Sequence, residues 1–145
     1  KKYKPHIIKR IIGHEGTLVE EIKPEYEQIP VKKETIEAVK AGMVAVTKGE
    51  EGTAARVFKD FPYKVAGKTG TAETGREANH SSNALFVSYA PADDPQIAVA
   101  VVVERGVWGS NTAPIARDIM EAYFKYSDKV KHSDKIEPEE IIFTH

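Results

Sequence analysis

Apolar and charged residues alternate in short runs over the first part of the chain. Residues 6–23 contain two runs rich in isoleucine, leucine and valine, and the segment 13–16 between them begins and ends with glycine. Such runs on either side of a glycine-containing turn are typical of a β-hairpin. We therefore predict two paired strands in this segment.

The spacing of the apolar residues changes after Pro30. Aliphatic side chains and a methionine then recur every three or four positions, with lysine and glutamate between them. This period predicts a helix that ends near Gly49 and Gly52, because glycine is common just after the last helical turn. The apolar face of the helix is expected to consist of Ile36, Val39, Met43 and Val46.

Strand signals return in three later segments, at residues 63–72, 84–90 and 97–103. The last segment is continuously apolar and rich in valine, which is typical of a central strand covered on both faces. A helix is predicted over residues 115–126. Its buried stripe is expected to consist of Ile115, Ile119, Tyr123 and Tyr126.

The order of these elements is hairpin, helix, three strands and helix. It predicts the α+β class, with helices packed on the faces of an antiparallel sheet. Residues 1–126 are assigned to one folded part of a domain, and the charge-rich residues 127–145 are assigned to a C-terminal tail. Because the chain starts at Lys1 rather than at a methionine, we interpret it as a fragment.

Composition and charge narrow the possible functions. The 145 residues carry 21 Lys and Arg against 22 Asp and Glu, a net charge of -1. A nucleic-acid-binding protein usually has a basic excess, so we expect no nucleic-acid partner. The absence of cysteine excludes disulfides and thiol chemistry, and the five histidines lack ligand spacing, so we predict no metal site and no cofactor.

The segment that carries chemistry is Val-Ala-Gly-Lys-Thr-Gly-Thr-Ala-Glu, residues 65–73. Its Gly-Lys-Thr letters fit the end of a phosphate-binding loop, which also needs a glycine five positions before Gly67. Pro62 stands there instead, and the residues that follow have the composition of a strand rather than of a helix. The phosphate-loop interpretation is therefore rejected.

A strand that binds an anionic substrate is another interpretation of the same residues, although the Lys-Thr-Gly letters alone favour a basic strand end before a turn. Lys68 supplies a positive charge, and Thr69 and Thr71 place two hydroxyl groups on one face because strand residues alternate. Gly70 removes a side chain and allows a backbone or a substrate to approach closely. A backbone N–H at this strand edge is also suited to stabilise a developing oxyanion.

The surrounding segments make this interpretation specific. They follow one another in a fixed order, at 42–46 (Gly-Met-Val-Ala-Val), 51–54 (Glu-Gly-Thr-Ala), 65–73, 84–91 (Ala-Leu-Phe-Val-Ser-Tyr-Ala-Pro) and 113–116 (Ala-Pro-Ile-Ala). Together they resemble the C-terminal half of the transpeptidase domain of class B penicillin-binding proteins of the cell-elongation type. The resemblance covers residues 4–126.

The resemblance implies a serine D,D-transpeptidase that cross-links peptidoglycan and is inhibited by β-lactams. Lys68 would orient the substrate and tune proton transfer, and Thr69 and Thr71 would hold the terminal carboxylate of a D-alanyl-D-alanine stem peptide or of a β-lactam. The Thr71 N–H would be an oxyanion donor, and Gly70 would be the close-approach position. The complete protein would lie at the extracytoplasmic face of the bacterial membrane, with its anchor outside this chain.

One part of the family's chemistry is missing from this sequence. The family's nucleophile lies in a Ser-x-x-Lys motif, and no serine of this chain has lysine three positions later. Ser81-Ser82-Asn83 has the letters of the second family motif, Ser-x-Asn, but it follows the Lys-Thr-Gly segment instead of preceding it. We expect a companion N-terminal part of the domain to supply the nucleophile, and this chain alone to be inactive.

Two other functions use the same strand. A β-lactam-binding sensor, or another non-catalytic binding module of this fold, is the main alternative, and a secreted serine β-lactamase is a weaker one. The segment 44–54 favours the elongation-type transpeptidase over the β-lactamase. Trp108 lies in a glycine-flanked loop, where we predict that it packs over the end of the sheet rather than lining a cleft.

Overall fold

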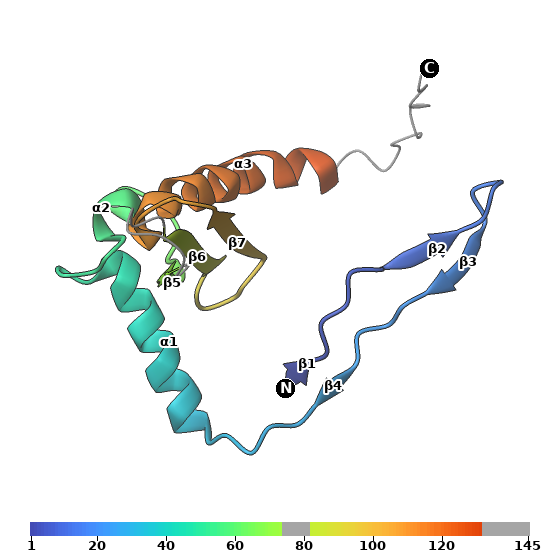
Figure 1. The fold of residues 1–145 in the computed structure, drawn as a ribbon, viewed down its shortest axis with the longest axis horizontal. Coiled ribbons are helices and arrows are strands. Elements are labelled where there is room, and N and C mark those ends of the chain that lie inside the picture. The colour runs from blue at the N-terminus through green and yellow to red at the C-terminus, as the bar shows by residue number, and fades with distance from the viewer. Residues whose placement is uncertain (74–81, 132–145) are drawn as a thin grey trace. The chain divides into compact units, whose positions relative to one another are not determined.

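The computed structural model describes residues 1–73 and 82–131. Two compact units make up the chain, Lys1–Ile36 and Glu37–His145. Figure 1 labels the helices and strands of both units.

The first unit is a ribbon of short antiparallel strands. β1 (Lys2–Tyr3) pairs with β4 (Tyr26–Glu27), and β2 (Arg10–Ile12) pairs with β3 (Leu18–Glu21). The turn between β2 and β3 contains Gly16 at a φ of 74°, in the left-handed region that glycine adopts without steric cost. The predicted hairpin is therefore confirmed.

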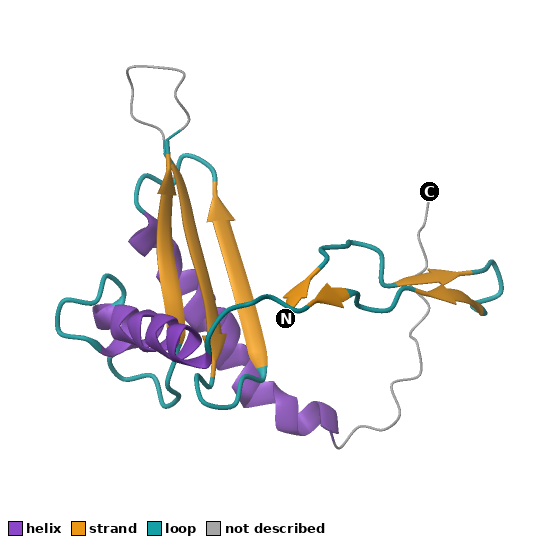
Figure 2. Ribbon diagram, turned by 90° about the horizontal axis from the view of Figure 1, so that it is seen from below, coloured by secondary structure: helices purple, strands orange, loops and turns teal. Residues whose placement is uncertain are grey.

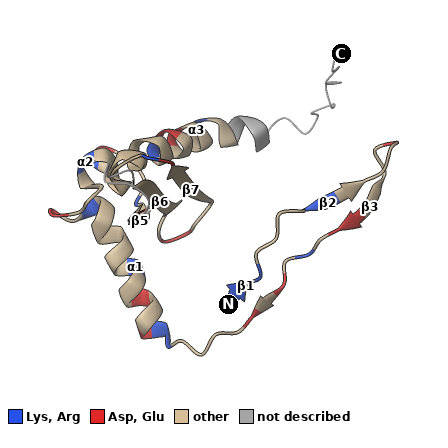
Figure 3. Cartoon of the chain, in the orientation of Figure 1, with Lys and Arg blue, Asp and Glu red and all other residues tan. Residues whose placement is uncertain are grey.

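Side chains of opposite charge face each other across this ribbon. Lys2 pairs with Glu27 at 3.0 Å, and Lys4 pairs with Glu25 at 3.3 Å. Figure 3 shows basic residues on β1 and β2 and mostly acidic residues along β3 and β4. None of the unit's side chains is buried, and most of its apolar residues are exposed, including Ile7, Ile12, Leu18 and Val19.

The helix predicted after Pro30 is α1 (Lys33–Lys48), and a single helical turn, α2 (Ala55–Phe58), follows it. The expected apolar face of α1 is only partly covered, because Ile36 and Val39 are exposed. The buried residue is Thr47, whose hydroxyl donates to the carbonyl oxygen of Val65 at 2.6 Å. The last turn of α1 is thereby attached to the segment that enters the sheet.

Three antiparallel strands form the sheet of the second unit. They are β5 (Ala66–Ala72), β6 (Asn83–Ala90) and β7 (Ile97–Val103), in that spatial order (Figure 2). The predicted strands are confirmed, and β7 has the predicted bounds.

The expectation that β7 is central and covered on both faces is wrong for the described residues. β6 is central, and β7 lies at the edge of the three-stranded sheet. Val99 and Val101 are buried, whereas Ala98, Ala100 and Val102 are exposed. The described helices cover one face of this strand, so an apolar run alone does not establish two-sided burial.

A short 3-10 turn, η1 (Gly109–Thr112), leads into α3 (Ala113–Lys131), which packs against β6 and β7. The helix is confirmed, but its predicted stripe is wrong, because Ile115 and Ile119 are each 44% exposed. Small residues and a methionine face the sheet instead, since they let the helix approach it closely. Within residues 113–127, where the burial is described, the buried residues of α3 are Ala113, Ala116 and Met120.

The core of this unit joins α2, the sheet and α3. Phe58 stacks on Phe86 of β6, with ring centroids 6.0 Å apart, and Met120 of α3 is fully buried in the same cluster. In the described ranges, no helix has the length and apolar character needed to cross a membrane.

Candidate functional site

The predicted chemistry lies on β5, which is the outer strand of the sheet opposite β7. Thr69 pairs with Phe86, and Thr71 pairs with Ala84, so both threonines lie on the face that carries the core. Lys68 and Gly70 alternate to the other face, opposite Val87 and Leu85. Thr69 is half-buried and Thr71 is exposed, because they lie toward the end of the strand, beyond the packed core.

The Lys68 side chain is exposed and bends back along its own strand. Its Nζ donates to the Thr69 carbonyl oxygen at 2.6 Å. An ammonium group has three donors, so this contact leaves capacity for an anionic ligand. The charge is therefore held close to the backbone of β5 at Thr69.

Thr69 has a hydroxyl neighbour from outside the strand. The loop between α1 and α2 brings Thr53 to it, and the two Oγ1 atoms lie 3.2 Å apart. The loop is positioned by its next residue, Ala54, which is buried and whose N–H donates to the Val46 carbonyl oxygen at 2.9 Å. A hydroxyl pair thus lies on the threonine face of β5.

Thr71 is held by backbone. The N–H of Gly109, the first residue of η1, donates to Thr71 Oγ1 at 3.2 Å. A Cβ atom on Gly109 would lie only 2.3 Å from the Gly70 carbonyl oxygen, so only glycine allows this approach. The position that corresponds to a Gly70 Cβ instead faces Leu85, at an ordinary contact distance of 3.4 Å.

The close approach expected at Gly70 therefore exists, but a different residue makes it possible. The neighbouring backbone comes from the threonine face, where the missing side chain of Gly109 provides the space. The missing side chain of Gly70 is on the opposite face of the strand.

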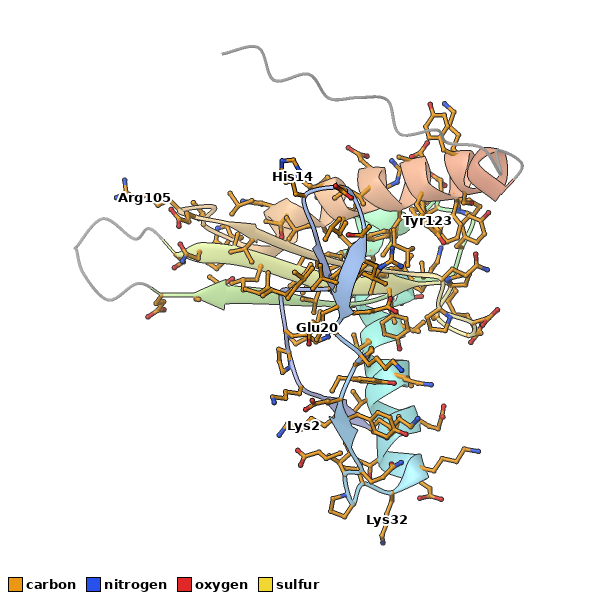
Figure 4. All side chains as sticks on the ribbon, turned by 90° about the vertical axis from the view of Figure 1, so that its right-hand side faces the viewer. Lys2, His14, Glu20, Lys32, Arg105 and Tyr123 are labelled. Carbon is orange, nitrogen blue, oxygen red and sulfur yellow. The ribbon has the colours of Figure 1, made fainter. Side chains whose placement is uncertain are left out.

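The loop before η1 has an unusual backbone. Arg105 and Val107 have φ values of 56° and 68°, which are uncommon for residues other than glycine and most of all for a β-branched one. Two hydrogen bonds hold the loop to the start of β6, from Arg105 N to Asn83 Oδ1 and from Val107 N to the Ser82 carbonyl oxygen. Arg105 extends away from the sheet at the end of β7 (Figure 4).

Trp108, in this loop, does not pack over the end of the sheet as predicted. It is 65% exposed. The strained loop directs the indole outward, while the next residue, Gly109, contacts β5. Asn83 and Ser82 act here as structural partners of the loop, and Ser81 lies outside the described residues.

No group of three or more His, Asp or Glu side chains suited to a metal ion occurs within residues 1–73 and 82–131. The titratable side chain on the described part of β5 is Lys68. The strand can therefore bind an anionic ligand through its threonine hydroxyl groups, the Lys68 ammonium group and backbone N–H groups.

Comparison with known families gives a match over most of the chain. The profile of the family described as "Penicillin binding protein transpeptidase domain" matches residues 1–121. The chain belongs to this family. The resemblance drawn from the sequence is confirmed.

Relatives of this penicillin-binding-protein chain are considerably longer than the chain itself. Peptidoglycan D,D-transpeptidase MrdA of Haemophilus influenzae is 36% identical over 135 residues, which cover 82% of this chain and 20% of the relative. The chain thus spans about a fifth of the length of this curated relative.

Solved structures of penicillin-binding proteins have the same fold. The structure of Pseudomonas aeruginosa PBP2 in complex with WCK 5153 matches with a TM-score of 0.63 and 38% identity, over 74% of this chain and 24% of that one. An imipenem acyl-enzyme complex of penicillin-binding protein A from M. tuberculosis also has a TM-score of 0.63, with 27% identity, over 84% and 26% of the two chains. The α+β class predicted for this transpeptidase fragment is confirmed.

The sequence identified the candidate strand, β5, but not the residues that support it. Lys68, Thr69, Gly70 and Thr71 lie together because they are consecutive. Thr53 and Gly109 were missed as neighbours of this strand, since the tertiary fold brings them there from 16 and 38 residues away. The Glu-Gly-Thr-Ala segment, 51–54, was noted only as part of the family resemblance.

Proposed function

We propose that this chain is the substrate-binding part of a serine D,D-transpeptidase that cross-links peptidoglycan stem peptides. The observation that carries the proposal is the outer strand β5, which presents Lys68 at its edge and two threonine hydroxyls on one face. The family match over residues 1–121 supports it, as does the similarity to a penicillin-binding protein solved as an acyl-enzyme with imipenem.

In the proposed reaction, a serine attacks the carbonyl carbon of the penultimate D-alanine of a stem peptide. The terminal D-alanine leaves, and the amine of a neighbouring stem peptide then displaces the serine and completes the cross-link. A β-lactam would acylate the same serine. Thr69 and Thr71 would donate to the terminal carboxylate of either ligand, and Lys68 would supply positive charge and assist proton transfer.

Backbone groups of the same strand would stabilise the transition state. The N–H of Thr71 is the proposed oxyanion donor on β5, where the negative charge of the tetrahedral intermediate develops. Gly70 would leave the backbone accessible between the two threonines. The protein requires no metal or other cofactor in this scheme.

A companion N-terminal part of the same domain would supply the serine and its base. The open edge of β7 and the exposed face around Val102 support this, because an apolar strand edge favours pairing with another strand. We propose that the 145-residue chain alone forms no acyl-enzyme. The complete protein would act at the extracytoplasmic face of the bacterial membrane.

The role of Lys68 can be tested in the full-length protein that carries this chain, by measuring acylation with a fluorescent penicillin. Lys68→Ala should slow acylation roughly a hundredfold, the lower end of what a group acting in proton transfer contributes. Lys64→Ala is the matched control, since Lys64 is also exposed, lies two residues before β5 and pairs with Asp93 at 2.8 Å.

Two results would overturn parts of this proposal. An unchanged acylation rate in Lys68→Ala would remove this residue from the mechanism. Covalent labelling of the isolated 145-residue chain at a specific serine, detected by mass spectrometry, would show that the nucleophile does not come from a companion part.

A further inference from the structure

The two threonine hydroxyls of β5 differ in what holds them. Thr71 Oγ1 accepts from the Gly109 N–H, which can only donate. The hydroxyl hydrogen of Thr71 therefore stays available for another acceptor. Thr69 Oγ1 instead lies 3.2 Å from Thr53 Oγ1, and either oxygen can be the donor in that pair.

A ligand carboxylate would remove this ambiguity. An ionised carboxylate only accepts hydrogen bonds, so Thr69 must turn its hydrogen toward the ligand in order to bind it. Thr53 then supplies the hydrogen for the Thr69–Thr53 contact. The result is a directed chain from Thr53 to Thr69 to the carboxylate, in which each hydrogen bond strengthens the next.

We propose that Thr53 is a positioning residue for carboxylate recognition, acting through Thr69; this inference rests on the proposed function. Thr53 itself does not touch the ligand. Its hydroxyl holds the Thr69 oxygen so that the Thr69 hydrogen points to the carboxylate. The Glu-Gly-Thr-Ala loop, residues 51–54, thereby becomes part of the substrate site.

The fold gives Thr53 a fixed place from which to act. Ala54, the next residue, is 1% exposed and is anchored to the last turn of α1 through Val46. Gly52 precedes Thr53, and a Cβ atom there would lie 2.4 Å from the Ala45 carbonyl oxygen, so this turn also packs closely on α1. Thr53 is thus held between two close backbone contacts, while its side chain stays exposed.

The test compares two ligands in the full-length protein, a penicillin with its free carboxylate and the methyl ester of the same penicillin. Thr53→Val replaces the hydroxyl with a methyl group of similar size. We expect it to lower the acylation efficiency of the free penicillin about tenfold, the effect of weakening one hydrogen bond to a charged group. Acylation by the methyl ester should change little, because the ester lacks the anionic acceptor.

Conservative variants of Thr53 show whether its hydroxyl group positions Thr69 or whether the residue only supports the local structure. Thr53→Ser keeps the hydroxyl and should restore most of the efficiency toward the free penicillin. Thr35→Val is the matched control, because it makes the same change at an exposed threonine in the first turn of α1. If Thr53→Val lowers the melting temperature of the protein, Thr53→Ala replaces it, and its acylation efficiency is compared with that of Thr53→Ser.

The outcomes distinguish this inference from the proposed function. If Thr69→Val slows acylation by the free penicillin but Thr53→Val does not, the role of Thr53 is wrong and the carboxylate site on β5 stands. An equal loss for the free penicillin and its ester in Thr53→Val, without rescue by serine, would also overturn it. If Thr69→Val has no effect either, the proposed carboxylate site itself is wrong.

Discussion

The two units of this chain both contain antiparallel strands but stabilise them differently. In the ribbon of residues 1–36, no side chain is buried, and exposed ion pairs such as Lys2–Glu27 cross between the strands. In the sheet unit, Phe58, Phe86 and Met120 are fully buried between the strands and the helices. A two-stranded ribbon is only marginally stable in water, whereas a sheet with one packed face is stable on its own.

This difference affects which of the two units can hold the side chains of the proposed site in fixed positions. The hydroxyl groups of β5 need fixed positions, and a core-backed strand provides them through contacts with Thr53 and Gly109. The ribbon has similar polar residues, but none of its own side chains is buried to form a core that would hold them. Substitutions in both units can test the contrast.

The largest effect is expected in the core of the sheet unit. Val101 is 9% exposed, and Val101→Asp would bury a carboxylate that has no partner, at a cost of several kcal/mol. Thermal unfolding of the 145-residue chain measures the loss. A variant that kept its melting temperature would show that this face of β7 is not buried.

The next residue of β7 is the matched control. Val102 is 61% exposed, so Val102→Asp should cost less than about 1 kcal/mol in the 145-residue chain. If a companion part covers this face, the same change should be clearly more destabilising in the full-length protein. Equal small effects in both would argue against coverage of this face.

An intermediate effect is expected where η1 crosses β5. Gly109→Ala would place a Cβ atom 2.3 Å from the Gly70 carbonyl oxygen, and the backbone must shift to relieve this, at about 1–3 kcal/mol. Gly70→Ala places its Cβ 3.4 Å from Leu85, an ordinary contact, and should be better tolerated. Melting temperatures of the two variants check the order, and the opposite order would mean that η1 does not press on β5.

The smallest effect is expected in the ribbon. Lys2→Ala removes the ion pair with Glu27, whose side chains are both about two-thirds exposed, and should cost less than about 1 kcal/mol. Added salt should weaken this small contribution further. A large fall in the melting temperature of Lys2→Ala would contradict the view that the ribbon adds little to stability.

The sequence predicted the elements better than it predicted their faces. The valine-rich run 97–103 was predicted with the observed bounds of β7, because β-branched residues bounded by turn residues are a strong local signal. The helical spacing of large apolar residues predicted that Ile115, Ile119, Tyr123 and Tyr126 form the buried stripe of α3. Ala116 and Met120 are buried against the sheet instead. No local sequence pattern indicates how closely a helix will approach a sheet.

For the candidate site, the sequence predicted the residues of the strand but not the contacts that other segments make with it. The Lys-Thr-Gly-Thr run could be recognised because its residues are consecutive and their alternation follows from strand geometry. The contact of Thr53 with Thr69 depends on the path of the chain between α1 and β5, which no spacing rule specifies. The approach of Gly109 to Gly70 likewise depends on tertiary packing, and the presence of glycine in this loop gave no signal of it.

The contact of Gly109 with Thr71 has a consequence for the entropy of binding. Ordering a side chain at an interface costs about 0.5–1.5 kcal/mol, and a site that orders its groups only when a ligand arrives loses that much affinity for each of them. The Gly109 N–H already fixes the position of Thr71 Oγ1 in the folded chain. That ordering is completed when the protein folds, so a ligand would meet a preorganised hydroxyl whose hydrogen alone has to turn.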